Sequence, residues 1–94
     1  MVELGWYYFK RGQYARTADY YDQVFAQRED NPDSYYHLAA AAWAELGDKT
    51  QALTYLYAAV DHGWTSAEYS EQVEAFHSLH GDPAWDTVLA RMRR

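Results

Sequence analysis

A single glycine between two helical stripes constrains this chain more than any other feature. Apolar residues recur at steps of three and four on both sides of Gly47, and this spacing places them on one face of each of two helices. Gly47 can end the first helix in the left-handed conformation, and Asp48 can cap the second. The short link predicts an antiparallel pair. The stripes comprise Tyr36, Ala39, Ala40, Trp43 and Leu46 before the glycine, and Ala52, Leu56, Ala59 and Val60 after it.

The same arrangement appears earlier in the chain at a fixed offset. Gly12 precedes Gly47 by 35 residues, and a third glycine follows 34 residues later. A period near 34 with two helices per unit is typical of the tetratricopeptide repeat (TPR). Leu4-Gly5-x-x-Tyr8 resembles the L-G-x-x-Y element of that family's first helix, and Ala39-Ala40-x-x-Trp43 occupies the same place in the next unit. The small-large-small pattern of the family's second helix is matched by Ala52, Leu56 and Ala59.

The chain departs from the TPR pattern at several positions. Thr17 replaces an expected alanine, Pro32 comes three residues late, and Glu74 and Asp86 occupy positions that are usually small. The resemblance therefore covers residues 3–64. It implies an all-α fold, a TPR-like α-solenoid of antiparallel helix pairs with five to six helices and right-handed superhelical stacking.

The repeat units define the expected organisation of one domain over residues 1–94. Residues 1–31 form the first repeat, 32–64 the second, and 65–94 a divergent capping segment that resembles the end of bacterial TPR arrays. Such a segment covers the apolar face that the end of a solenoid exposes.

The helix ends follow from local signals. We expect helices over 2–11 and 13–28, a cap at Asn31 before the third helix, and a capping box at Thr65-Ser66-Ala67-Glu68 before the fifth. Asp82-Pro83 begins the last helix.

Composition excludes several classes of function. The net charge is -6 and no segment is basic, so the cationic surface that binds nucleic acid or anionic membranes is missing. There is no cysteine, hence no disulfide or thiolate metal site. The sequence shows neither a membrane-spanning run nor a signal-peptide pattern. We expect a cytoplasmic protein without a cofactor.

Catalytic and metal motifs are weak. Glu74, His77 and His80 could share a helix face and bind zinc, but no established metal-binding signature accompanies them, and solvent-exposed side chains explain them better. The acidic pairs Glu71/Glu74 and Asp19/Asp22 are also typical of solvated helix faces. No nucleophile or phosphate-binding motif is present. We therefore predict a protein that is not an enzyme and holds no metal.

The remaining functional signal is a concave surface, which the TPR resemblance assigns to the first helix of each unit. Trp6 and Phe9 lie opposite the stripe that packs within the first pair, so they are free to act as binding anchors. The family's Lys/Asn clamp for C-terminal carboxylates is not met, because Trp6 replaces the expected asparagine. The predicted partner-binding residues are Trp6, Phe9, Lys10, His37, Ala41 and Glu45, with Val2, Ser34 and Ala44 on the same face.

Two functions remain open from the sequence. The first is a protein-interaction module that binds a peptide or a partner surface in this groove. The second is a structural role, in which the chain is the C-terminal end of a larger array or forms a homodimer through its N-terminal helix. In the second case Trp6 and Phe9 pack against a missing helix or a second copy.

Overall fold

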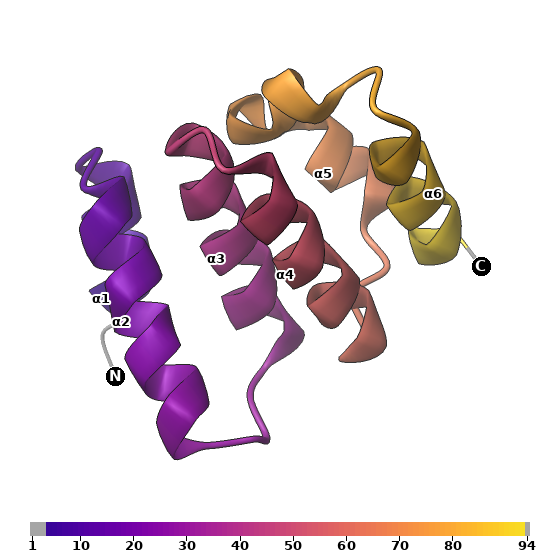
Figure 1. Cartoon of the computed structure of the whole chain (residues 1–94). Coiled ribbons are helices and arrows are strands. Elements are labelled where there is room, and N and C mark those ends of the chain that lie inside the picture. Colours follow the sequence, from indigo (N-terminus) through magenta and orange to yellow (C-terminus); the bar gives the residue numbers. More distant parts are fainter. Residues whose placement is uncertain (1–3, 94) are drawn as a thin grey trace.

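A computed structural model describes residues 4–93, and every regular element within this range is a helix (Figure 1). The all-α prediction is confirmed. The number of helices differs slightly from the expected five to six, because residues 4–93 contain a 3-10 helix, η1, in addition to six α-helices. None of the helices in residues 4–93 is long and apolar enough to cross a bilayer. The elements are α1 (Leu4–Lys10), α2 (Tyr14–Gln27), α3 (Asp33–Glu45), α4 (Lys49–Asp61), α5 (Ala67–Gln72), η1 (Glu74–Leu79) and α6 (Pro83–Met92).

The first four helices form two hairpins with the same turn. Gly12 and Gly47 both have positive φ, 74° and 84°, the left-handed region that glycine enters without steric cost. In each turn the residue after the glycine donates its N–H to the helix carbonyl five residues back, as in a Schellman motif. Asp48 then accepts from the Gln51 N–H at 3.0 Å, which confirms its predicted capping role.

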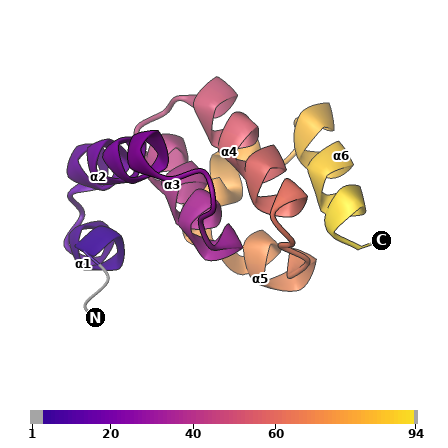
Figure 2. The ribbon, with the colours of Figure 1, turned by 90° about the horizontal axis from the view of Figure 1, so that it is seen from below.

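Consecutive helices pair from α1 to α4, and beyond them α6 packs against α4 while η1 packs against α3 (Figure 1). In the view from below, α2, α4 and α6 lie along one side, and α1 and α5 lie on the other side with α3 between them (Figure 2). This arrangement leaves α3 flanked by chain on both sides, whereas α1 has neighbours on one side only.

The core runs from the alanines of α3 into the C-terminal segment. Close packing needs small residues where two backbones approach, and five alanines of α3 are buried. η1 packs against α3, and α6 packs against α4. Their buried side chains are Ala75, Phe76, Leu79, Trp85, Val88, Leu89 and Met92.

Thr17 is accommodated at the position where alanine was expected. It is fully buried, and its hydroxyl donates to the Gln13 carbonyl one turn earlier at 2.9 Å. Because the hydroxyl finds this partner within its own helix, burial leaves no unpaired polar group.

Two predictions about helix ends and packing are wrong at the α3 boundaries. Asn31 does not cap α3, because its side-chain amide instead donates to the Arg28 carbonyl at 2.7 Å, and Pro32 occupies the N-cap position. Leu46 was assigned to the apolar stripe, but it is 44% exposed. It is the C-cap residue, where the chain already leaves the helix face that packs on α4.

The capping segment also begins differently from its prediction. The capping box at Thr65-Ser66-Ala67-Glu68 does not form, since no side chain caps α5. Val73 then has an extended backbone conformation, φ -70° and ψ 117°, which ends α5 and starts η1. At α6 the prediction holds, because Asp82 accepts from the Ala84 N–H at 2.9 Å and Pro83 takes the first turn.

Candidate functional site

A groove lies between α1, α3 and α5. It consists of two adjoining hollows of about 210 and 320 Å³ that share Trp6, His37, Leu38 and Tyr69. We call it the aromatic groove. Its remaining lining residues are Phe9, Ala41, Gln72 and Val73 in the larger hollow, and Tyr21, Ser34, Tyr35 and Trp64 in the smaller one.

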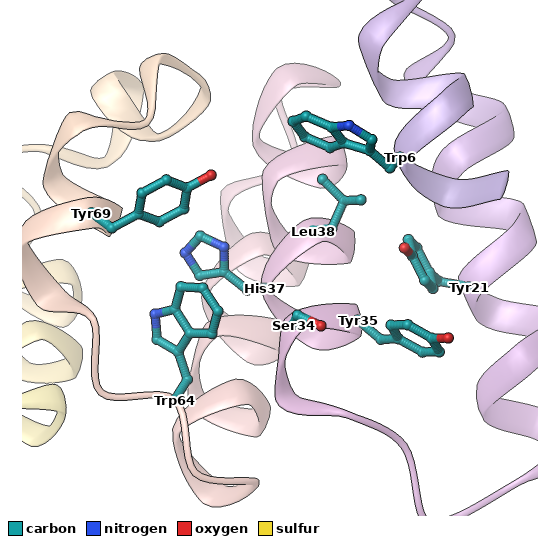
Figure 3. A pocket seen from close by; sticks show the side chains of 8 residues that line it. All are labelled: Trp6, Tyr21, Ser34, Tyr35, His37, Leu38, Trp64 and Tyr69. Carbon is teal, nitrogen blue, oxygen red and sulfur yellow. The ribbon is translucent and has the colours of Figure 1, made fainter. Parts of the chain in front are cut away.

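Two large aromatic side chains form opposite walls of the aromatic groove. Trp6 extends from α1 and Tyr69 from α5, with Leu38 and His37 of α3 between them (Figure 3). Trp6 is 46% exposed and Tyr69 is 53% exposed. Trp6 also stacks on Phe9, with ring centroids 6.1 Å apart and planes within 9°. Both walls therefore present flat apolar surface to solvent.

The floor of the aromatic groove is fixed by a buried polar network around His37. Its Nε2 lies 2.9 Å from the Ser70 hydroxyl, and its ring stacks on Trp64 at 4.0 Å. The Ser70 hydroxyl donates to the Ser66 carbonyl and accepts from Trp64 Nε1. When the Ser70 hydroxyl donates its one hydrogen to Ser66, the neutral His37 tautomer with its hydrogen on Nε2 donates to Ser70. This network ties α3 to α5 and holds the floor rigid.

The His37 imidazole carries no charge at neutral pH. Burial lowers its pKa from 6.5 to about 4, because taking the imidazolium out of water costs free energy that no nearby carboxylate offsets. The floor of the aromatic groove is therefore neutral and mainly apolar.

One end of the aromatic groove is acidic. Hydrogen bonding to Glu45 raises the pKa of the Tyr14 hydroxyl, with smaller contributions from desolvation and from the charges of Glu45 and Glu74. Tyr14 also contacts Phe9, with ring centroids 5.2 Å apart. Glu45 and, more weakly, Glu74 therefore act on a tyrosine that packs beside Phe9, at one end of the larger hollow.

The structure brings together four of the six residues predicted as a site. Trp6, Phe9, His37 and Ala41 all line the larger hollow. Lys10 and Glu45 do not line either hollow; the Lys10 amine lies 5.8 Å from the Trp6 ring centroid and Glu45 lies near Tyr14.

The three secondary candidates have different positions. Ser34 lines the smaller hollow. Ala44 is buried and lines neither hollow. Val2 lies outside the described residues.

Sequence reasoning missed the wall that α5 supplies. Tyr69, Gln72 and Val73 come from the segment that was expected only to cap the array. Leu38 was also missed, because it adjoins the stripe that packs on α4. An aromatic residue in the short helix after Gly63 was the available signal, but local spacing does not indicate which neighbour that helix faces.

The metal site, the carboxylate pairs and a serine nucleophile are not supported by the positions of the side chains concerned. Within residues 4–93 no group of three or more histidine, cysteine or acidic side chains is placed to hold a metal ion. Glu71 pairs with Arg93, and Asp22 accepts from the Tyr55 hydroxyl at 3.0 Å, so each of these carboxylates has a structural partner. Ser70 is fully buried beside His37, so this pair is not arranged as an accessible nucleophile and base.

Comparison with known proteins finds no counterpart. The chain matches no family model, no curated protein and no solved structure. The function is therefore inferred from the aromatic groove itself.

Proposed function

We propose that this protein is a non-catalytic interaction module that binds a peptide or a partner surface in its aromatic groove. One observation carries the proposal: Trp6 and Tyr69 stay about half exposed on opposite walls of a hollow formed by three helices. Exposed aromatic rings cost free energy in water, and rings that line a concave surface are typical anchors for a partner.

The rigidity of the aromatic groove supports this proposal. His37 is held by Ser70 and Trp64, and Trp6 is stacked on Phe9. A ligand would therefore meet His37 and Trp6 already held by these contacts. Pre-organised surfaces of this kind bind more tightly because less entropy is lost on association.

The scaffold that best accounts for the groove is a TPR-like solenoid with right-handed stacking. Its support is the 35-residue offset between Gly12 and Gly47, which make the same turn. A second support is that α1, α3 and α5, the first helices of successive units, all contribute lining residues. In this proposal the molecule works in the cytoplasm and its partner is a protein or peptide.

The proposal is tested by peptide selection against the intact chain. A displayed library of random 12-residue peptides is selected on the wild-type protein, and an enriched peptide is then titrated by fluorescence polarisation. We expect Trp6→Ala to weaken binding by about tenfold or more, since it removes a central anchor. Selection that enriches no peptide would contradict the proposal.

Tyr7→Ala is the matched control for this experiment. Tyr7 is 45% exposed on the same helix, close to the 46% of Trp6, but it lines neither hollow and instead packs under Arg11. Its removal should change the affinity by less than about twofold. Equal weakening by both variants would show that the peptide binds α1 in general rather than the aromatic groove.

Self-association through α1 is the second candidate. Leu4 and Tyr7 are 43% and 45% exposed on this terminal helix, so an apolar face remains that a second copy or further repeats of a larger array would cover. Light scattering distinguishes the two functions. A dimer that dissociates in Leu4→Ala favours self-association, whereas a monomer that binds peptide favours the interaction module.

A further inference from the structure

The acidic end of the aromatic groove is not neutralised by the protein. Glu45 comes one helical turn after Ala41, and Glu74 directly follows Val73, so both carboxylates adjoin lining residues of the larger hollow. The Tyr14 ring contacts Phe9 of the larger hollow, with centroids 5.2 Å apart, and the pKa of the Tyr14 hydroxyl is raised by its hydrogen bond to Glu45 and by the charges of Glu45 and Glu74. Among residues 4–93 the ion pairs are Arg91–Asp61 and Arg93–Glu71, and neither involves these two carboxylates.

One basic side chain, Lys10, lies beside the Trp6 wall of the groove. Lys10 lies against the Trp6 ring, at 5.8 Å from its centroid, and makes no ion pair with Glu45 or Glu74 within the described residues. The neutral floor adds no positive charge. A ligand in the larger hollow would therefore meet aromatic walls in the middle and two negative charges at one end.

We propose that the ligand is a basic peptide: an aromatic or branched aliphatic side chain inserts between Trp6 and Tyr69, and a lysine or arginine nearby pairs with Glu45 and Glu74. This inference rests on the proposed function and adds the chemistry of the partner. Charge complementarity carries it, because an acidic peptide would place like charges against the same two carboxylates. The overall charge of -6 would also attract a basic partner at long range.

The geometry of α3 sets the spacing between the two peptide residues. Leu38 on the floor is seven residues before Glu45, and Ala41 is four residues before it. At about 1.5 Å per helical residue these steps span roughly 6 to 10 Å along α3. An extended peptide advances about 3.3 Å per residue, so the basic residue should stand two or three positions from the apolar anchor.

The test uses the enriched peptides described above. We expect them to share an apolar anchor with lysine or arginine two or three positions away. Replacing that basic residue with glutamine should weaken binding to the wild-type protein by about fivefold at low salt. The same replacement should have no effect on binding to the double variant Glu45→Gln, Glu74→Gln.

A matched double variant separates local pairing from net charge. Glu29→Gln with Asp86→Asn removes the same two charges, and neither exposed side chain lines the groove. This control should retain the fivefold difference between the lysine and glutamine peptides. If it loses the difference as well, the preference comes from overall charge and the proposed pairing is wrong.

The outcomes also distinguish this inference from the proposed function. Enriched peptides without a basic residue, whose binding still depends on Trp6, would overturn the basic-peptide inference and leave the interaction module standing. Selection that enriches no peptide would overturn both.

Discussion

The helix hairpins α1–α2 and α3–α4 have the same turn, but different residues fill the place where their helices approach most closely. A shift of 35 residues superimposes Gly12 on Gly47, Gly5 on Ala40 and Tyr21 on Leu56. In the first hairpin Gly5 lies against the Tyr21 ring, and a Cβ at Gly5 would come within 2.2 Å of the Tyr21 hydroxyl. In the second, Ala40 and Leu56 are both fully buried in the central core. The smaller residue, Gly5, thus packs against the larger side chain, Tyr21, whereas Ala40 corresponds to Gly5 and Leu56 to Tyr21.

The same 35-residue shift relates Trp6 to Ala41, and these two side chains differ in how much of their surface is exposed. Trp6 is 46% exposed, whereas Ala41 is 2% exposed, although both line the aromatic groove. The difference follows from position in the stack, because α3 has helices on both sides and α1 has them on one (Figure 2). Positions related by the 35-residue shift therefore need not be buried alike, and α1, with neighbours on one side only, leaves an aromatic side chain exposed where α3 buries an alanine.

The largest predicted effect separates a core position from an end position. Leu56→Ala should lower the free energy of unfolding by roughly 2–5 kcal/mol, because it leaves a cavity at a fully buried site. Leu4→Ala in the first hairpin should cost less than about 1 kcal/mol, since Leu4 is 43% exposed. Urea denaturation followed by circular dichroism measures both. Equal losses would mean that the two hairpins contribute alike to the core.

Acid should destabilise the second hairpin through His37. Its pKa is 6.5 in the unfolded chain and about 4 in the fold, so between these values the unfolded state binds a proton that the folded state does not. The stability lost as pH falls from 7 to 4 is therefore roughly 3 kcal/mol from this group.

The neutral variant His37→Gln tests this pH dependence. Its free energy of unfolding should fall less steeply with acid than that of the wild type. Parallel pH profiles for wild type and His37→Gln would contradict the assignment.

Replacing Gly5 and Tyr21 with the residues at the corresponding positions of the second hairpin, alanine and leucine, should show that their effects on the free energy of unfolding are coupled. Gly5→Ala should cost roughly 1–3 kcal/mol, because the buried Tyr21 ring leaves no room for a methyl group. The double variant Gly5→Ala, Tyr21→Leu reproduces the Ala40 and Leu56 combination and should lose less than the sum of the two single changes. A double-mutant cycle in urea measures this coupling. Strict additivity would show that the two positions do not depend on each other.

The smallest predicted effect compares the two turns. Gly12→Ala and Gly47→Ala should each cost about 1 kcal/mol, because alanine is strained at positive φ. No neighbouring side chain would clash at either position, so the two losses should agree within about 0.5 kcal/mol. A much larger loss at one turn in thermal unfolding would break the equivalence of the hairpins.

Much of the fold was accessible from local patterns, and the errors have a common cause. The glycine turns, the Asp48 cap and the α6 start depend on residues within one or two turns of each other, and all were predicted correctly. Asn31 and the capping box before α5 offered the same local signals but found other partners or none. Short polar side chains have several possible local partners, such as the Arg28 carbonyl three residues before Asn31, and the sequence pattern alone does not choose among them.

The sequence by itself determined that this chain is helical, where its hairpins turn and which alanines permit close packing, because periodicity and backbone conformation are local properties. Only the tertiary structure decided that Tyr69 and Val73 face Trp6 across α3, that His37 is buried and neutral, and that two carboxylates adjoin the groove. These features depend on the break at Val73 and on which helices end the stack. Such long-range contacts leave no mark in the spacing of nearby residues.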